Sequence, residues 1–243
     1  MCGGTNLTAT PEELAEAFAL DEAPELGPRY NIAPTQPMPA VRVHAAARTR
    51  RLSLLRWGLV PYWAADPAVG ARMINARAET VARLPAFRDA FRERRCLVPA
   101  SGFYEWRRAE KGRQPWLLRR RDGKLMGFAG LWDRWRPAPG DARHDEPLES
   151  CAVLTTPANE LVARLHDRMP LVLDPADYEL WLDPDVRDPE RLAALLRPFP
   201  AEEMEAIPVS PRVNSPNNDD ASLLERVEPE PEPDPEPRQR TLF

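Results

Sequence analysis

The segment Arg95-Cys-Leu-Val-Pro-Ala-Ser-Gly-Phe-Tyr-Glu-Trp106 decides the fold, because it predicts β-structure in the middle of the chain. It is an apolar run rich in residues that favour strands. Working outward from it, further segments on both sides also predict strands: Ala40–Val43, Leu52–Leu59, Trp116–Arg120, Leu125–Trp132, Cys151–Thr155 and Ala206–Pro208. We therefore expect most of the middle of the chain to form β-sheet.

Proline-containing helix starts surround these strands. Thr10-Pro11, followed by Glu13, has the pattern of an N-cap, a first-turn proline and a capping box. Similar starts occur at Thr156-Pro157, Asp174-Pro175 and Asp188-Pro189. Helices and strands do not alternate regularly. This favours an α+β fold, with a largely antiparallel, barrel-like β core and flanking helices, over a doubly wound fold.

The composition changes near the C-terminal end. Glu228–Pro237 alternates acidic residues with proline, so it buries no apolar area and its like charges repel. We expect one domain over residues 1–222 and a disordered, Glu/Pro-rich linker over residues 223–243. The final peptide resembles the short motifs that dock on bacterial sliding clamps, with Gln239, Leu242 and Phe243 as the contacts. The linker would then act as a tether.

Composition limits the compartment and the chemistry. The three cysteines are an odd number, which argues against a disulfide framework. Their spacing matches no zinc pattern, so we expect neither a metal nor a cofactor. No apolar run approaches the ~20 residues of a membrane span, and the N-terminus lacks the pattern of a signal peptide. We expect a cytoplasmic monomer, associated with the bacterial nucleoid.

The charge distribution suggests a partner. The net charge is −5, but residues 72–121 carry 14 Lys or Arg against 5 Asp or Glu. A basic segment inside an acidic protein is a candidate phosphate-facing surface. The same pattern also describes an ordinary solvated face, or the arginine bias of a genome, so charge alone does not decide the partner.

The start of the chain, Met1-Cys2-Gly3, offers a reactive group. Removal of Met1 would leave an α-amine beside a thiol. A free α-amine has a pKa of about 7.7–8, against about 10.4 for lysine, so much more of it is neutral and nucleophilic. It can form a Schiff base with an aldehyde, and the thiol of Cys2 can then close a thiazolidine. Alternatively, Cys2 is a tolerated small residue, or the nucleophile of a glutamine amidotransferase, whose downstream pattern is not seen.

Five segments in order decide between these interpretations: Arg29–Gln36, Arg56–Trp63, Ile74–Thr80, Arg95–Trp106 and Leu165–Pro170. From Cys2 to about Asn218, the chain resembles the SRAP family, the SOS-response-associated peptidases understood as abasic-site processing proteins. The resemblance implies a sensor of abasic sites in the DNA damage response. Such a sensor binds single-stranded DNA and forms a covalent thiazolidine crosslink through Cys2, with AP-lyase and self-processing peptidase activities as further expectations.

The resemblance also assigns chemical roles. Glu105 becomes the acid that opens the closed sugar, and its neighbours Tyr104 and Trp106 would raise its pKa by desolvation. Asn75 orients the N-terminal amine, and His166 moves protons, with Asp167 as its orienting partner. Taken alone, these residues also fit a structural strand glutamate, a turn-capping asparagine and a core histidine.

DNA contacts follow from the same resemblance. Arg77 and Arg168 would hold phosphates, for which the guanidinium fork is suited. Pro34, Trp63 and Thr155 would line the DNA cleft. Trp63 could stack on an exposed base or pack in the core.

Two departures from the family pattern stand out. Gly4 replaces the family's arginine, which puts one phosphate or backbone contact in doubt. Residues 81–86 lack the family's basic residue and Met wedge, for which Arg83 is a candidate substitute. Two other functions remain open: an N-terminal-cysteine hydrolase with His166 as base, and a non-covalent nucleic-acid-binding module.

Overall fold

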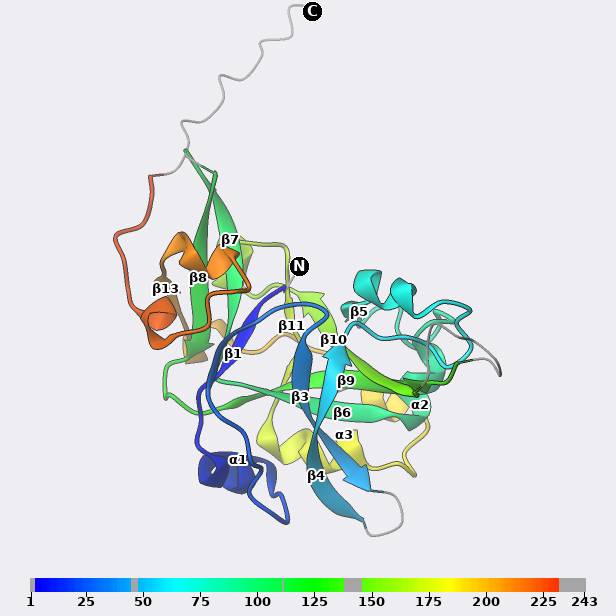
Figure 1. The fold of residues 1–243 in the computed structure, drawn as a ribbon. Helices are drawn as coiled ribbons and strands as arrows, with labels where there is room; N and C mark the ends of the chain where they lie inside the picture. The colour runs from blue at the N-terminus through cyan, green and yellow to red at the C-terminus, as the bar shows by residue number, and fades with distance from the viewer. Residues whose placement is uncertain (1–2, 45–47, 111, 138–145, 232–243) are drawn as a thin grey trace, which may run out of the picture.

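A closed β-barrel forms the centre of the molecule (Figure 1). The computed structural model describes residues 3–44, 48–110, 112–137 and 146–231. Neighbouring barrel strands follow the order β10–β4–β3–β6–β9 and then return to β10, and only the β4–β10 pair is parallel. These strands are β3 (Pro37–His44), β4 (Thr49–Trp57), β6 (Arg95–Ala100), β9 (Met126–Trp135) and β10 (Leu148–Pro157).

Short strands extend the barrel at its edges. β5 (Asn75–Arg77) and β11 (Arg168–Pro170) pair with β10, and β12 (Val172–Leu173) pairs with β9. A second, fully antiparallel sheet has the order β13–β8–β7–β1–β2. Its strands are β1 (Thr5–Leu7), β2 (Arg29–Ile32), β7 (Gly102–Ala109), β8 (Gly112–Arg120) and β13 (Met204–Pro208). The expected α+β fold with a largely antiparallel barrel is confirmed.

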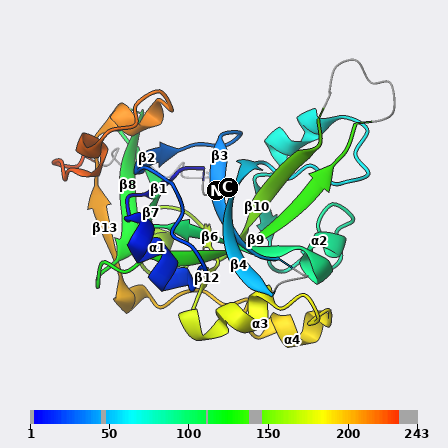
Figure 2. The same cartoon turned by 60° about the horizontal axis from the view of Figure 1, so that its bottom comes forward.

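The strand expected over Arg95–Trp106 serves both sheets. It is divided at Ser101 into β6 of the barrel and β7 of the second sheet. Gly102 allows this crossing, because an added Cβ would approach Leu117 Cδ1 to 2.6 Å and the Leu118 carbonyl oxygen to 2.9 Å. Figure 2 shows the second sheet to one side of the barrel, as does Figure 1.

Helices are few and short. They are α1 (Pro11–Phe18), α2 (Arg88–Glu93), α3 (Tyr178–Leu182) and α4 (Pro189–Ala193). The expected capping box of α1 is present: the Thr10 side chain accepts from the Glu13 amide, and the Glu13 carboxylate accepts from the Thr10 amide. The other turns are 3₁₀ helices at Pro67–Arg72, Val162–Arg164, Pro175–Asp177, Ala201–Glu203, Pro211–Asn214 and Ala221–Leu224. None of the helices in the described ranges is long and apolar enough to cross a membrane.

The expected helix after Thr156-Pro157 is wrong. Thr156 pairs with Met169 of β11 and Pro157 pairs with Arg168, so this backbone is extended. Helical structure resumes only in the single 3₁₀ turn Val162–Arg164. The sheet pairing of β10 with β11 therefore overrides a local signal for a helix start. By contrast, Asp174 and Asp188 do cap the turns that follow them.

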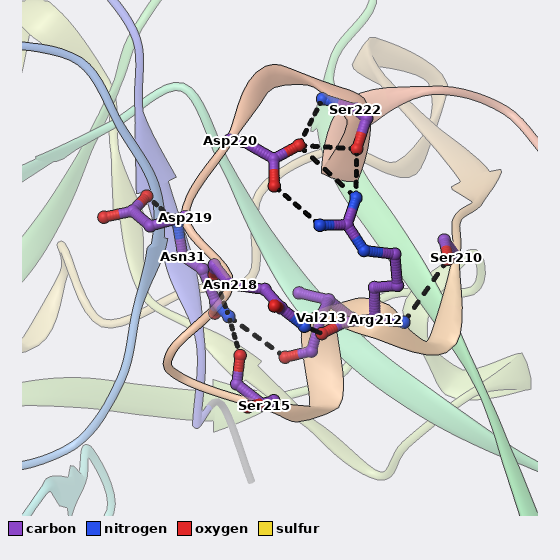
Figure 3. A network of polar contacts seen from close by, with 9 residues as sticks. All are labelled: Asn31, Ser210, Arg212, Val213, Ser215, Asn218, Asp219, Asp220 and Ser222. Carbon is purple, nitrogen blue, oxygen red and sulfur yellow. Dashed lines mark hydrogen bonds and ion pairs between the residues drawn. The ribbon is translucent and has the colours of Figure 1, made fainter.

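The last turns of the domain are fastened to β2 by a polar network (Figure 3). The Asn31 side-chain amide donates to three carbonyl oxygens at 3.1 Å each, those of Val213, Ser215 and Asn218. Asp219 accepts from the Asn31 backbone amide at 3.0 Å. The segment after β13 thus covers one end of the second sheet.

The packed chain continues beyond residue 222, the position at which the sequence predicts the domain to end. Leu223 is fully buried. The Val227 amide donates to the Pro208 carbonyl oxygen at 2.9 Å, and the Glu230 amide donates to Gln114 Oε1 at 3.1 Å. These two hydrogen bonds thus hold the start of the Glu/Pro segment against β13 and β8 of the second sheet. The expected clamp peptide, with Gln239, Leu242 and Phe243, lies outside the described residues.

Candidate functional site

Residues from two of the resemblance segments, Ile74–Thr80 and Leu165–Pro170, meet around the end of strand β10. On one side β5 runs parallel to it, with Asn75 opposite Val153 and Arg77 opposite Thr155. On the other side β11 runs antiparallel, with Arg168 opposite Pro157. One strand thus holds Asn75 and Arg77 on one flank and Arg168 on the other.

Thr155 contributes its backbone to this arrangement. Its carbonyl oxygen accepts from the Ala78 amide at 2.9 Å and from Arg168 Nη2 at 2.7 Å. Thr155 is only 2% exposed. Its role is therefore to hold Ala78 and Arg168 in place through its carbonyl oxygen. Arg77, in contrast, is exposed.

His166 lies just before β11 and is held by its own neighbours. Its Nδ1 accepts the Arg168 backbone N–H at 3.0 Å, and Asp167 Oδ1 lies 2.9 Å from the same nitrogen. One ring nitrogen cannot accept and donate at once. Burial lowers the pKa of His166, which favours the neutral ring that accepts from Arg168 and carries its proton on Nε2. The contact with Asp167 becomes a hydrogen bond when the ring is protonated.

Glu105 is a buried acid on β7. It is 1% exposed, and burial raises its pKa to about 7, with a further upward contribution from the charge of Asp167. Asp167 therefore acts electrostatically on Glu105 and contacts His166. This links the acid of the second sheet to the histidine beside the barrel. A carboxylic acid with a pKa of about 7 is still about half protonated at neutral pH and can act as a proton donor there.

The first described residues of the chain pair with β7, the strand that carries Glu105. The Tyr104 amide donates to the Gly4 carbonyl oxygen at 2.9 Å, and Thr5 pairs with Phe103. Continued by one step, this register sets Gly3 opposite Glu105. Cys2 itself lies outside the described residues.

Packing does not require glycine at position 4. A Cβ there would meet Trp106 Cη2 and Tyr104 Cδ2 at 3.4 Å, which is an ordinary contact distance. Trp106 is itself fixed, because its Nε1 donates to Asn214 Oδ1 at 2.7 Å. The space for the family's arginine at this position is therefore not closed by the neighbouring backbone.

Pro34 and Trp63 lie on separate loops. The turn after Pro34 is tied to β4, since the Thr35 amide donates to the Trp57 carbonyl oxygen at 2.8 Å. Trp57 Nε1 in turn donates at 2.9 Å to the carbonyl oxygen of Ile74, the residue before Asn75. Trp63 is 53% exposed, so it is a surface residue and not part of the core. Among the described residues, no hydrogen bond, ion pair or ring contact joins the Trp63 side chain to the residues around the end of β10.

Sequence reasoning missed Glu79, which forms a two-point ion pair with Arg168. The residue stands inside the quoted segment Ile74–Thr80, two positions after Arg77, and that spacing was the available signal. In the region where the family pattern is lost, Arg83 Nη2 donates to the Glu79 carbonyl oxygen at 3.4 Å, and Leu84 is exposed.

The residues around the end of β10 do not line the cavity beside α1. This cavity of about 770 Å³ lies between α1 and β8, and its lining includes none of the residues above. In the described part of the chain, no three His, Cys, Asp or Glu side chains gather as a group that could hold a metal ion.

Comparisons with known proteins identify the family. The profile described as "SOS response associated peptidase (SRAP)" matches residues 1–216. The chain is 40% identical to the abasic site processing protein YoqW of Bacillus subtilis over 229 residues, which cover 93% of this chain and 99% of that protein. It is 32% identical to the abasic site processing protein HMCES of Gallus gallus over 230 residues, which cover 83% of this chain and 67% of that protein.

A solved structure agrees with these relatives. A crystal structure of a protein from Bacteroides thetaiotaomicron superposes with a TM-score of 0.81 at 26% identity, covering 93% of this chain and all of the other. The order of the five segments, the barrel with its second sheet and these matches lead to one conclusion. The chain belongs to the SOS response associated peptidase (SRAP) family.

Proposed function

We propose that this protein captures abasic sites in single-stranded DNA by forming a covalent thiazolidine crosslink through Cys2, once Met1 has been removed. The observation that carries the proposal is the acid beside the start of the chain. Glu105 is buried and has a pKa of about 7, and the β1–β7 pairing leads the chain past it. A proton donor thus lies opposite Gly3, the residue that follows Cys2 in the sequence.

The chemistry needs that donor because an abasic deoxyribose is mostly a closed hemiacetal. Glu105 gives a proton to the ring oxygen as the bond from that oxygen to C1 breaks, and the C1 hydroxyl loses its proton to solvent, which leaves the open-chain aldehyde. The neutral α-amine adds to the aldehyde carbon, and one water leaves to give the Schiff base. The thiol then adds to the imine carbon and transfers its proton to the nitrogen. The net reaction joins protein and sugar and releases one water.

Asn75 and His166 support these proton movements. Asn75 is held on β5 beside β10, where its side-chain amide can orient the amine. His166 is kept neutral by its lowered pKa, with Nδ1 accepting from the Arg168 amide. A neutral imidazole can take the proton that the amine loses and return it during reversal. We expect His166→Ala to slow reversal more than formation of the crosslink.

DNA would lie over the exposed cations and the exposed indole around β5 and β10. Arg77 and Trp63 both face solvent, which suits a phosphate contact and a sequence-tolerant stacking contact. Pro34 and Arg168 are proposed as further DNA contacts. Thr155 would act through its backbone.

The test is a denaturing gel of purified protein incubated with a single-stranded oligonucleotide carrying one abasic site. We expect a shifted, heat-stable band that disappears for Cys2→Ala and for protein that keeps Met1, as checked by intact mass. A band that survives both changes refutes the N-terminal mechanism. Cleavage of the DNA strand without a band would favour a lyase, cleavage of peptides would favour the hydrolase, and reversible binding alone would favour the non-covalent module.

We also propose that the final residues bind a sliding clamp. The support is the sequence of the peptide, with Gln239, Leu242 and Phe243 spaced as in clamp-docking peptides. A fluorescent peptide of residues 234–243 should bind purified clamp, and the double alanine variant at positions 242 and 243 should not. If the two peptides bind equally, or neither binds, this proposal fails while the crosslinking chemistry is unaffected.

A further inference from the structure

An ion pair crosses strand β10 at the candidate site. Glu79 follows β5, and Arg168 begins β11 on the opposite flank of β10. Both carboxylate oxygens of Glu79 accept from the guanidinium, with Nη2 to Oε2 at 2.8 Å. Arg168 Nη2 also donates to the Thr155 carbonyl oxygen at 2.7 Å. The Arg168 guanidinium is therefore bound both by the backbone of β10 and by the Glu79 carboxylate.

The two partners differ in exposure. The Arg168 side chain is 12% exposed, whereas that of Glu79 is 47% exposed. Glu79 can therefore move into solvent at small cost, but Arg168 stays in place through its bond to Thr155. The pKa of Glu79 is lowered, first by the hydrogen bond from Arg168 and also by the charge of Arg77. The carboxylate thus remains ionised and feels both arginines that are proposed to hold phosphates.

A carboxylate in a guanidinium fork has a close chemical analogue. The two non-bridging oxygens of a phosphodiester accept the same pair of N–H donors in the same planar geometry. The place that Glu79 fills on Arg168 is therefore shaped for one DNA phosphate. Phosphate and Glu79 cannot both occupy it.

We propose that Glu79 is a built-in competitor for DNA phosphate, which must be displaced from Arg168 before the strand is fully seated. The inference rests on the proposed function, because it takes the DNA strand to lie across β5 and β11. Its consequence is selectivity. Undamaged DNA has to replace the carboxylate by non-covalent contacts alone, whereas an abasic strand is retained by the bond that it forms. Glu79 is thus a residue that weakens binding without touching the reacting atoms.

The test measures the affinity for an undamaged single-stranded thymidine oligonucleotide at fixed salt, by fluorescence anisotropy. Glu79→Gln keeps the shape but removes the charge, and we expect about fivefold tighter binding, as for the loss of a competing surface ion pair. In the Arg168→Ala background the same change should have no effect, because the competition needs both partners. Glu205→Gln is the matched control, since Glu205 pairs with Arg119 on the second sheet, and it should leave the affinity unchanged.

Other outcomes overturn the inference. Equal tightening by Glu79→Gln with and without Arg168 means simple repulsion of DNA by the carboxylate. Weaker binding by Glu79→Gln means that the ion pair builds the site instead of blocking it. If Arg168→Ala does not fold, the Arg168 Nε–H resonance of the wild-type protein decides, because titration with the oligonucleotide should shift it. An unshifted resonance in a protein that still crosslinks abasic DNA refutes the exchange but not the proposed function.

Discussion

The barrel and the second sheet contribute different kinds of groups to the site. The barrel edge presents its arginines at β5 and β11, and the exposed Trp63 follows β4. The second sheet presents a buried acid, Glu105, and the start of the chain. The first set suits binding of an extended anion, whereas the second suits proton transfer in a place screened from water. We therefore expect changes on the barrel side to alter affinity and changes on the second sheet to alter rate.

The two regions also differ in how they are held. The barrel closes on itself through the β9–β10 pairing, so each of its five strands has two neighbours. The second sheet is open and ends at β2. Its free edge is covered by the turns that Asn31 fastens. The second sheet, which carries Glu105, is thus covered at this edge by a polar network, whereas the barrel closes through strand pairing alone.

The largest expected effect is on rate, from Glu105→Gln. Loss of the proton donor should slow crosslink formation about 100-fold or more, within the usual range for a general acid. The affinity for undamaged single-stranded DNA should not change. Single-turnover gel assays and anisotropy measure the two quantities, with the exposed Glu110→Gln as control. Equal losses of rate and affinity would contradict the division between the two regions.

The same variant should be more stable than the wild type at alkaline pH. The pKa of Glu105 is about 7 in the folded chain, above its ordinary value of 4.5. The folded state therefore binds this proton more tightly, and the free energy of unfolding falls as the pH rises from about 4.5 to about 7. Glutamine removes this loss. Urea unfolding at pH 5 and pH 8 should show a gain for the variant only at pH 8.

The next effect is on stability, from Asn31→Ala. This change leaves three carbonyl oxygens without the amide that binds them, so we expect a loss of about 2–3 kcal/mol in the free energy of unfolding. Ser210→Ala removes only the acceptor for the Arg212 amide in the same network and should cost much less. Chemical unfolding measures both. Equal losses would mean that Asn31 does not hold the C-terminal turns.

A smaller effect is expected on the barrel side, from Trp63→Ala. Loss of one stacked base should weaken binding of single-stranded DNA about tenfold, with an unchanged crosslink rate at saturating DNA. Leu54 is equally exposed, and Leu54→Ala therefore controls for the loss of apolar surface. A lower crosslink rate at saturating DNA would mean that Trp63 takes part in the chemistry. It would contradict the expectation that the barrel side alters affinity alone.

Much of this division could be predicted from the sequence. The apolar runs located most strands, and Thr10, Asp174 and Asp188 marked true caps. Pairing could not be predicted locally. Nothing in the run Arg95–Trp106 says that it changes sheets at Ser101, because the crossing depends on space beside Leu117. For the same reason the local signal at Thr156-Pro157 predicts a helix, where the chain in fact pairs with β11.

The sequence predicts candidate site residues but not their contacts. The quoted segments contain Asn75, Glu105 and His166, which lie on β5, on β7 and just before β11. The pairing of Glu79 with Arg168 spans 89 residues, so it depends on the order of the strands. The burial that raises the pKa of Glu105 likewise exists only in the folded chain.

The smallest expected effect is a shift in pH dependence, from Asp167→Asn. Asp167 acts on both regions, because its charge shifts the pKa of Glu105 upward and opposes the lowering of the His166 pKa by burial. Without this charge Glu105 loses its proton at lower pH, so the fall of the crosslink rate toward high pH should begin earlier, by a fraction of a pH unit. The shift is small because the Asp167 side chain is 85% exposed, and solvent and salt screen its charge.

The measurement is a pH–rate profile of single-turnover crosslinking. Asp21→Asn removes the same charge at an exposed residue after α1 and should leave the profile unchanged. Raising the salt concentration should bring the wild-type profile toward that of Asp167→Asn, since the interaction is electrostatic. A shift to higher pH would mean that Asp167 does not act on Glu105 by its charge. The histidine on the barrel side and the acid on the second sheet would then titrate independently.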